Sequence, residues 1–444
     1  CMMYERVTSA LGVRPPQISH EEMRLRQSSF CNQLELDSIA IITNNPVAIR
    51  SRDTHYRHRF NSYLHYLTGW HGEDGVAVFH NDGAWKCRLY VQERDVVKEI
   101  WTGRRPGTEG ALSKWPVDET VRRDEISQDL GELILDSKRI YHIKGLDPVV
   151  DEVVNKTFDE VLDPRKILDD MRVIKSESEI ALMQYAADLA GLAHIEAMRE
   201  CQPGIGEWQL QSIIEGCFLY HQSEWAYPSI VGSGDNATIL HYNTNSQPTK
   251  DGEVVLIDAG CEVDGYASDI TRSFPVNGRF TEAQREIYQL VLDAQLAGID
   301  ACKVGAPWSA MHHATSRVLA QGLVDLGILE CTFEEALGED FNGQFRQFFM
   351  HGTGHLLGLD VHDVGGGRQG DEEAERILEA GMVLTVEPGL YFGAWREDIE
   401  IDSRWAGIGI RIEDDVLITD DGPVILTCKC PKQISEIESL VGAN

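Results

Sequence analysis

Residues 256–271 read Leu-Ile-Asp-Ala-Gly-Cys-Glu-Val-Asp-Gly-Tyr-Ala-Ser-Asp-Ile-Thr, a pattern that is typical of a β-hairpin. The turn falls at Asp264-Gly265, near the midpoint between Asp258 and Asp269, so each arm carries one aspartate. Because residues opposite each other on a hairpin share one face, we expect the two carboxylates to lie close together. The apolar flanks of both aspartates disfavour the alternative of two solvent-exposed turn acids. An unpaired buried carboxylate is costly, so the hairpin predicts a bound cation.

Three short motifs that follow the hairpin add candidates for the same site. The first is His351-Gly-Thr-Gly-His355, whose glycines favour an irregular loop over a helix, and His362 follows shortly after it. The second contains Glu387 directly before Pro-Gly, which fixes the backbone and ends the strand. The third ends at Glu413, and we interpret part of the acidity of the next two residues, Asp414-Asp415, as a solvent-exposed strand end.

The residue types in these motifs favour a metal centre. Four carboxylates and one imidazole suit two divalent ions, and such oxygen-rich ligation fits Mn²⁺, Co²⁺, Fe²⁺ or Zn²⁺. Two ions about 3.5–4 Å apart lower the pKa of a bridging water and stabilise a tetrahedral intermediate, which makes hydrolysis the expected reaction. His241 or His362 would then polarise the carbonyl group. The five candidate ligands are Asp258, Asp269, His355, Glu387 and Glu413.

Composition excludes several classes of partner. The chain has 444 residues, with 40 Lys and Arg against 72 Asp and Glu, so its formal net charge is −32. This charge argues against nucleic acids and anionic membranes as partners, and we interpret it mainly as a contribution to solubility. No stretch approaches the roughly 20 apolar residues that cross a bilayer, so we expect no membrane partner.

The length predicts two domains. We interpret residues 1–16 as a loose leader, and from residue 18 to 172 helical patterns alternate with β-rich runs, which is typical of an α/β domain. Ser176 then caps a helix that runs towards Arg199. Two similar halves follow, with antiparallel strands predicted at 254–259 and 268–274 in the first and at 382–392 and 407–418 in the second. Helices are predicted between them at 282–302 and 308–326. The predicted domains are therefore 1–172 and 173–444.

Cysteine usage bears on the location of the protein. The ten cysteines show no disulfide framework, and this usage favours free thiols in a reducing compartment. The first thirty residues lack the pattern of a signal peptide. We therefore expect a cytoplasmic protein.

The motifs taken together resemble one family, the bacterial aminopeptidases P (Xaa-Pro aminopeptidases) in the proline-peptidase branch of the pita-bread metallopeptidases. The resemblance covers nearly the whole chain from residue 18 onwards. It implies an α/β N-terminal domain and an α+β pita-bread catalytic domain with pseudo-twofold halves. The stretches that carry it are Ile257-Asp-Ala-Gly-Cys-Glu262, Asp269-Ile-Thr-Arg272, Phe274-Pro-Val-Asn-Gly278, Met350-His-Gly352, Leu357-Gly-Leu-Asp-Val-His-Asp-Val-Gly365, Thr385-Val-Glu-Pro-Gly-Leu-Tyr391 and Gly407-Ile-Gly-Ile-Arg-Ile-Glu-Asp-Asp415.

The resemblance implies unequal roles for the five candidate ligands. Residues matching Asp258, Asp269 and Glu413 bind one metal in the family. Those matching Asp269, His355, Glu387 and Glu413 bind the other, so Asp269 and Glu413 would bridge the two ions. We expect Mn²⁺ in preference to Co²⁺, Fe²⁺ or Zn²⁺. Glu387 would also move protons.

The resemblance also implies a substrate pocket and an oligomer. In the family, residues matching His241 and His362 steady the carbonyl group, and those matching His351, Tyr391 and Arg411 line the pocket for the proline ring. We count Glu387, His241, His362 and His351 as catalytic candidates. A residue matching Trp101 reaches a neighbouring subunit's active site, which implies a homo-oligomer, a tetramer or a dimer. The chain departs from the family pattern at Asn61-Ser-Tyr-Leu-His-Tyr66, which bears on subunit contacts and specificity, and at Glu379-Ala-Gly-Met382.

The leading hypothesis is an aminopeptidase that hydrolyses the N-terminal Xaa-Pro bond of peptides with proline at the second position. A metal-bridging hydroxide would attack, and Glu387 would shuttle the proton to the departing proline nitrogen. Prolidase, which cleaves Xaa-Pro dipeptides, is the enzymatic alternative; the long N-terminal domain disfavours a methionine aminopeptidase. The alternative from a different class is a catalytically inactive pita-bread binding protein. Such proteins lose ligands, whereas all five are present here.

Overall fold

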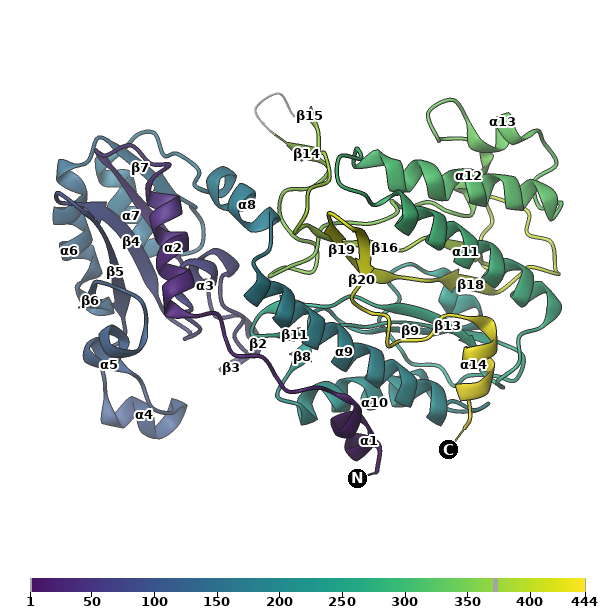
Figure 1. The fold of residues 1–444 in the computed structure, drawn as a ribbon. Helices are drawn as coiled ribbons and strands as arrows, with labels where there is room; N and C mark the ends of the chain where they lie inside the picture. The colour runs from purple at the N-terminus through teal and green to yellow at the C-terminus, as the bar shows by residue number, and fades with distance from the viewer. Residues whose placement is uncertain (1, 370–373, 444) are drawn as a thin grey trace. The chain divides into compact units, whose positions relative to one another are not determined.

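The computed structural model describes residues 2–369 and 374–443, which divide into two compact units (Figure 1). One unit is Pro16–Met171, and the other combines the first fifteen residues with the chain from Arg172 onwards. The division falls one residue before the predicted boundary at 172/173. In the described part of the chain no helix is long and apolar enough to cross a membrane.

The expectation of a loose leader is wrong. Residues Met2–Ala10 form helix α1, which packs on helix α9 (Glu177–Glu200) of the C-terminal unit. Val7 is buried in this contact, and Arg6 forms an ion pair with Glu196 of α9. Arg14 bonds to Asp264 at 3.0 Å, so the segment is attached at both ends. Cys1 lies outside the described residues.

The unit Pro16–Met171 is an α/β domain around one mixed sheet with the strand order β6-β5-β4-β1-β7. β1 pairs parallel with β7 and antiparallel with β4, and apolar residues of these strands pack against α6 and α7. A separate short hairpin joins β2 to β3, and α8 contains the division between the units. The strands are β1 (Ser38–Thr43), β2 (Ile49–Ser51), β3 (Thr54–His55), β4 (Val76–Asn81), β5 (Trp85–Val91), β6 (Glu119–Arg122) and β7 (Arg139–His142). The helices are α2 (His20–Cys31), α3 (Ser62–Thr68), α4 (Val96–Thr102), α5 (Gly107–Lys114), α6 (Ile126–Leu133), α7 (Pro148–Thr157) and α8 (Arg165–Val173), with 3-10 turns η1 (Arg123–Glu125) and η2 (Ile134–Asp136).

The C-terminal unit contains the two predicted halves. Its further helices are α10 (Glu207–Tyr220), α11 (Glu282–Ala301), α12 (Ser309–Asp325), α13 (Phe333–Leu337) and α14 (Ile434–Leu440), with 3-10 turns η3 (Gly234–Thr238) and η4 (Gln344–Gln347). Its strands are β8 (Glu224–Trp225), β9 (Ile230–Ser233), β10 (Val254–Asp258), β11 (Cys261–Val263), β12 (Tyr266–Ala267), β13 (Thr271–Pro275), β14 (Arg368–Gln369), β15 (Ala374–Glu375), β16 (Val383–Val386), β17 (Gly389–Phe392), β18 (Ile408–Arg411), β19 (Asp414–Thr419) and β20 (Gly422–Ile425).

Each half pairs two helices with a small antiparallel sheet. The first half has α9, α10 and the sheet β13-β10-β9, and the second has α11, α12 and the sheet β16-β19-β20. Figure 1 shows the strands between the two helix pairs. Ser176 and Thr281 cap α9 and α11 through reciprocal hydrogen bonds with a Glu or Gln three residues on, which explains where these helices begin.

The hairpin predicted at 256–271 is confirmed. β10 pairs with β13 in the register that sets Asp258 opposite Thr271, and β11 pairs with β12 across the turn. Asp264 and Gly265 have φ angles of 51° and 87°, the left-handed values that a tight two-residue hairpin turn requires. An irregular stretch between β12 and β13 places Asp269 beside Asp258 rather than within the ladder.

Close backbone contacts join the two halves at this hairpin. Thr271 forms an isolated bridge with Glu413, which comes between β18 and β19. The loop that carries His355 lies against β16, where a Cβ atom on Gly354 would fall 1.8 Å from the carbonyl oxygen of Thr385. Only glycine allows this approach, which brings the histidine loop to the carboxylates.

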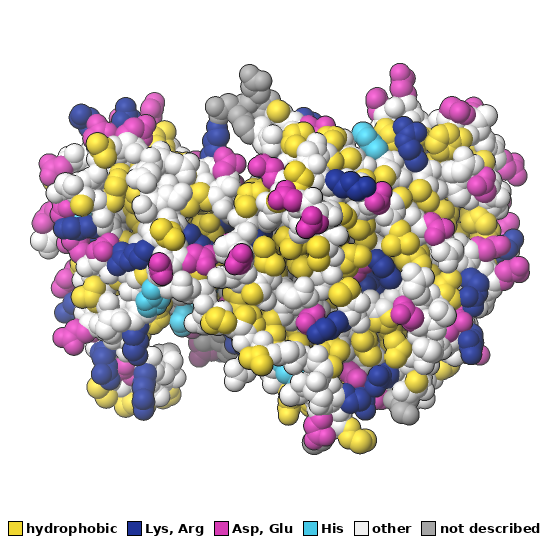
Figure 2. Space-filling model, in the orientation of Figure 1, with side chains coloured by type: hydrophobic (Ala, Val, Ile, Leu, Met, Phe, Trp, Pro, Cys, Tyr) yellow, Lys and Arg dark blue, Asp and Glu magenta, His cyan; other side chains and the backbone are white. Residues whose placement is uncertain are grey.

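Figure 2 shows Asp and Glu side chains spread over the visible face among Lys and Arg, an arrangement that supports solubility. The described cysteines carry free thiols, and most of them are buried.

Candidate active site

A cavity of about 470 Å³ in the C-terminal unit brings the predicted site residues together. All five candidate ligands line it, and so do three further histidines that the sequence motifs singled out. The ligands are Asp258, Asp269, His355, Glu387 and Glu413, and the histidines are His241, His351 and His362.

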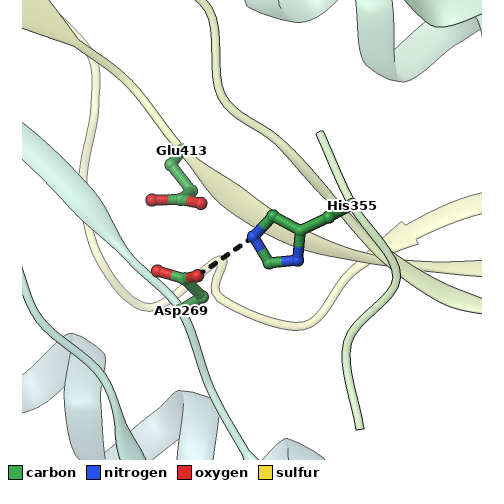
Figure 3. Close-up of side chains that lie close together, drawn as sticks. All are labelled: Asp269, His355 and Glu413. Atoms are coloured by element: carbon green, nitrogen blue, oxygen red, sulfur yellow. Dashed lines mark ion pairs between the residues drawn. The ribbon is translucent and has the colours of Figure 1, made fainter. Parts of the chain in front are cut away.

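Asp269, His355 and Glu413 form the centre of the cluster (Figure 3). One side-chain ligand atom from each lies within 4.8 Å of the other two, a spacing that would hold a metal ion. The three residues come from the stretch before β13, the loop after η4 and the junction of β18 with β19. Figure 3 shows the imidazole pointing towards the two carboxylates, and Nε2 of His355 lies 3.4 Å from Oδ2 of Asp269.

Hydrogen bonds orient His355 for ligation. Its Nδ1 donates to the carbonyl oxygen of Leu356 at 2.9 Å, so Nε2 is left to face the carboxylates. The backbone N–H of His355 donates to the hydroxyl of Thr385 at 3.0 Å, and this hydroxyl in turn donates to Oε1 of Glu387 at 3.2 Å. Oε1 of Glu387 is itself 3.4 Å from Nε2 of His355. One threonine thus positions two candidate ligands.

Asp258 is held by two donors. The hydroxyl of Tyr227 donates to Oδ1 at 2.6 Å and also contacts Oδ1 of Asp269, and Nη2 of Arg411 donates to Oδ2 at 2.8 Å. Burial and the neighbouring carboxylates raise the pKa of Tyr227 well above its ordinary value, so this residue remains a donor. The motifs did not identify Tyr227, because nothing in Trp225-Ala-Tyr-Pro228 marks it as distinct from an ordinary core aromatic.

The electrostatics of the cluster fit a divalent cation. Burial, followed by repulsion from the neighbouring carboxylates, raises the pKa of Asp258 and holds that of Glu413 well above its ordinary value. Burial also raises the pKa of Glu387 to about 7. Burial lowers the pKa of His355, but the hydrogen bond and charge of Asp269 outweigh it and raise the pKa to about 9. Several acids that share a buried space with too little positive charge form a donor set that suits metal ions.

The interpretation of Asp414 and Asp415 as a solvent-exposed strand end is wrong, because both side chains are buried. Asp414 pairs with Arg272 at 2.7 Å and with Lys432 at 2.6 Å. Asp415 accepts the backbone N–H of Asp269 at 3.1 Å and thereby fixes the backbone of a candidate ligand. Asp414 and Asp415 are therefore buried structural residues that stabilise the packing next to the site.

Further residues fix the walls of the cavity. Nε2 of His351 and the hydroxyl of Tyr391 are 2.8 Å apart, and Nη1 of Arg411 donates to the same hydroxyl at 3.0 Å. His351 and Arg411 line the cavity, whereas Tyr391 lies behind His351 and lines an adjoining recess. Burial and the nearby Arg411 lower the pKa of His351 to about 3, so its ring is neutral. The ring centroid of His362 lies 4.5 Å from that of His355.

Two further residues, His312 and Trp101, lie away from the cavity wall. Nδ1 of His312, on α12, lies 2.8 Å from the hydroxyl of Thr353, whose carbonyl oxygen accepts the backbone N–H of Glu387 at 2.7 Å. This contact supports the histidine loop from behind, and no motif indicated it. Trp101 lies on α4 of the N-terminal unit with 83% of its surface exposed, and it does not line the cavity.

Asp363 anchors the segment that carries His362. Its side chain is 1% exposed and bonds to Arg172 at 2.6 Å and to Lys175 at 2.9 Å. Burial raises the pKa of Asp363, but the two cations outweigh it and hold the pKa below its ordinary value of 3.8.

We expect Asp363→Asn to lower the free energy of unfolding at pH 7 by about 2–3 kcal/mol, because the buried Lys175 loses its counter-charge and the buried Arg172 loses one of its two carboxylate partners. A lowered folded pKa contributes stability above the unfolded pKa, and this contribution is lost as the pH falls through the folded pKa. The difference between wild type and variant should therefore be constant down to about pH 4 and shrink below it. Urea titrations at several pH values measure it. Asp360→Asn is the matched control, since Asp360 pairs with the same Arg172 but is 44% exposed and screened by solvent. A pH-independent difference for Asp363→Asn contradicts the prediction.

Comparison with known proteins gives consistent matches over most of the chain. The model of metallopeptidase family M24 matches residues 181–420, and that of the aminopeptidase P N-terminal domain matches residues 23–141. The chain is 40% identical to the Xaa-Pro aminopeptidase of Escherichia coli strain K12, over 96% of this chain and 99% of the relative. It is also 40% identical to the Xaa-Pro aminopeptidase of Haemophilus influenzae, over 96% and 98% of the two chains.

Solved structures agree with these matches. The structure of Pseudomonas aeruginosa aminopeptidase PepP superposes with a TM-score of 0.91 at 40% identity and covers 96% of this chain and 99% of that one. Escherichia coli aminopeptidase P with the inhibitor Pro-Leu superposes with the same TM-score, identity and coverage. The predicted resemblance and the predicted fold, an α/β domain followed by a pita-bread domain, are thereby confirmed. The chain belongs to metallopeptidase family M24 and carries the N-terminal domain of aminopeptidase P.

Proposed function

We propose that this protein is an aminopeptidase that hydrolyses the bond between an N-terminal residue and a proline at the second position. The observation that carries the proposal is the single cavity in which four carboxylates and one imidazole face three further histidines. The similar proteins of Escherichia coli and Haemophilus influenzae are Xaa-Pro aminopeptidases. Escherichia coli aminopeptidase P has been solved with the inhibitor Pro-Leu, and a glutamate-to-alanine variant of it has been solved with substrate.

Two divalent ions, with Mn²⁺ as the first choice, fit the donor set. Asp258, Asp269 and Glu413 would hold one ion, and Asp269, His355, Glu387 and Glu413 the other. When bound, such ions supply Lewis-acid polarisation and a water molecule of lowered pKa. The raised pKa values of Asp258 and Glu413 support this assignment, because burial and the neighbouring carboxylates outweigh the nearby Arg411 and leave room for further positive charge.

Glu387 is suited to hold and deliver a proton. The departing proline nitrogen is a secondary amine that needs a proton, and a general acid works best when its pKa lies near the working pH. Burial raises the pKa of Glu387 to about 7 in the metal-free chain, and the hydroxyl of Thr385 donates to Oε1 and fixes the carboxylate. Glu387 would take the proton that the attacking water releases and deliver it to the leaving nitrogen.

The remaining groups bind and orient the peptide. The neutral ring of His351 can lie against the apolar proline ring without the cost of burying a charge. Ile230, Leu240 and Val361 add apolar surface to the same cavity. His241 and His362 lie at the wall where a substrate carbonyl group would need a donor.

A peptide-length series tests this function. We expect hydrolysis of Xaa-Pro tripeptides and longer peptides with Mn²⁺, followed by Co²⁺ and Zn²⁺ in turn, and release of the first residue only. Cleavage restricted to Xaa-Pro dipeptides would favour the prolidase alternative. Failure of every metal to bind, together with no hydrolysis, would favour the inactive binding protein.

We also propose a homo-oligomer in the cytoplasm. Helix α4 has no buried residue and exposes Val96 at 70%, Val97 at 69%, Ile100 at 76% and Trp101 at 83%. Such an apolar face is typical of a protein–protein contact. The free thiols of the described cysteines support a reducing compartment.

We expect Trp101→Glu to shift the protein to a smaller assembly, because it places a charge in a proposed apolar contact. Light scattering coupled to size-exclusion chromatography measures the mass. Leu135→Glu is a control, since Leu135 is 68% exposed in the same unit but belongs to no such helix face. Equal masses for wild type and Trp101→Glu would remove Trp101 from the contact.

A further inference from the structure

A second recess, of about 310 Å³, lies next to the active-site cavity. Leu240 lines both hollows, and Tyr391 lines the recess while its hydroxyl contacts His351 in the cavity wall. Met350, the neighbour of His351 in the chain, also lines the recess. A peptide residue that follows a proline held at His351 would therefore reach this recess, because an extended chain advances about 3.3 Å per residue.

Two guanidinium groups give the recess a positive character. Arg346 is half-buried, lies 5.5 Å from the ring centroid of Phe349 and donates through Nη1 to the carbonyl oxygen of His351 at 2.8 Å. Within the described residues Arg346 forms no ion pair, and burial lowers its pKa. Arg346 is thus a cation in the wall of the recess whose charge no described carboxylate neutralises, although the chain has 72 acidic and 40 basic residues.

The second guanidinium, Arg396, has an exchangeable partner. It donates through Nε to Oδ1 of Asp398 at 3.0 Å and through Nη2 to Oδ2 of the same carboxylate, and Nη1 donates to the carbonyl oxygen of Gln347, which also lines the recess. The side chain of Asp398 is 65% exposed, so solvent screens this pair and another carboxylate can compete for the guanidinium.

The apolar part of the recess fits the rest of an amino-acid residue. Trp395 donates its indole N–H to the hydroxyl of Thr238 at 2.9 Å, which fixes the ring. Met350 and Ile239 are partly exposed beside it. The recess thus combines an apolar surface with guanidinium groups, as a residue that carries a carboxylate requires.

We propose that this recess binds a carboxylate on the residue after proline, either the C-terminal carboxylate of a short peptide or the side chain of Asp or Glu. The proposal rests on the proposed function, because proline must occupy the pocket at His351. A net charge of −32 repels acidic peptides. The positive charge of the recess would offset this repulsion locally, at the position of the peptide's carboxylate.

Binding of product-like dipeptides tests the recess without catalysis. Isothermal titration of the Mn²⁺-supplemented protein compares Pro-Leu with Pro-Leu amide, which isolates the C-terminal carboxylate. Pro-Asp amide compared with Pro-Asn amide isolates the side chain. We expect the carboxylate of at least one pair to tighten binding about tenfold, the size of a charge-assisted hydrogen bond.

Variants assign the effect to the recess. Arg396→Gln should reduce the acid-to-amide ratio of dissociation constants towards one, and Asp398→Asn should increase it, because the competing carboxylate is gone. Arg404→Gln is the matched control from the same segment, since Arg404 pairs with Glu286 and does not line the recess; it should leave the ratio unchanged. Equal affinities for acid and amide in both pairs, no binding of any dipeptide, or the same ratio in Arg396→Gln as in wild type would overturn the proposal. The hydrolysis series decides the proposed function separately, so the two failures are distinguishable.

Discussion

Replacement of Glu387 by alanine is expected to abolish hydrolysis of an Arg-Pro-Pro peptide while the protein remains folded. The carboxyl group has two proposed roles, as a metal ligand and as the proton donor to the leaving nitrogen. General acid catalysis alone is worth about 10²–10⁴-fold, and loss of a ligand adds to it. We therefore expect kcat/KM to fall to below about one thousandth of the wild-type value.

Matched variants separate the two roles. Glu387→Gln retains the size of the side chain and a carbonyl oxygen but has no proton to exchange at neutral pH. Glu379→Ala removes an exposed acid eight positions earlier and should leave kcat/KM within twofold. Metal analysis of each variant shows whether ligation is lost, and circular dichroism shows whether the fold persists. Turnover of Glu387→Ala within tenfold of wild type would contradict the proposed mechanism.

The five candidate ligands could be predicted because each carries a local signature. Asp258 ends an apolar strand, Glu387 stands before Pro-Gly, and His355 follows Gly354, which permits a close approach to β16. Such signatures arise where the backbone must adopt unusual dihedral angles or pack closely. These requirements select glycine or proline among the neighbouring residues, which the sequence shows directly. The hairpin at 256–271 was predictable for the same reason.

Tyr227 and His312 could not be predicted, because their roles depend only on proximity in space. Tyr227 reaches Asp258 across 31 positions of sequence, and His312 reaches Thr353 across 41. Neither has a distinctive neighbourhood in the chain. The short N-terminal helix was missed for a related reason, since its stability comes from Val7 and Arg6 packing on α9 rather than from its own sequence.

Asp414, predicted from the sequence to lie at the solvent-exposed end of a strand, is the residue whose replacement we expect to change stability most. Adjacent acids at the end of a strand usually face water, and nothing in the local sequence identifies Arg272, 142 positions earlier, as a partner. In the folded chain both side chains of this pair are fully buried. Arg272 also donates to the backbone carbonyl of Glu413 at 2.6 Å, which couples the buried pair to a candidate ligand.

Asp414→Ala is therefore expected to lower the free energy of unfolding by about 3–5 kcal/mol, the cost of leaving a buried cation without its partner. The variant removes the counter-charge of two cations, because both Arg272 and Lys432 pair with the Asp414 carboxylate, Lys432 at 2.6 Å. Asp420→Ala is the matched control, because Asp420 is an exposed aspartate just beyond the end of β19 and should change stability by less than about 0.5 kcal/mol. Urea titration of the two variants measures both values. A loss below about 1 kcal/mol for Asp414→Ala would mean that water reaches Arg272 and Lys432, and that the interior beside Glu413 is not held by charge.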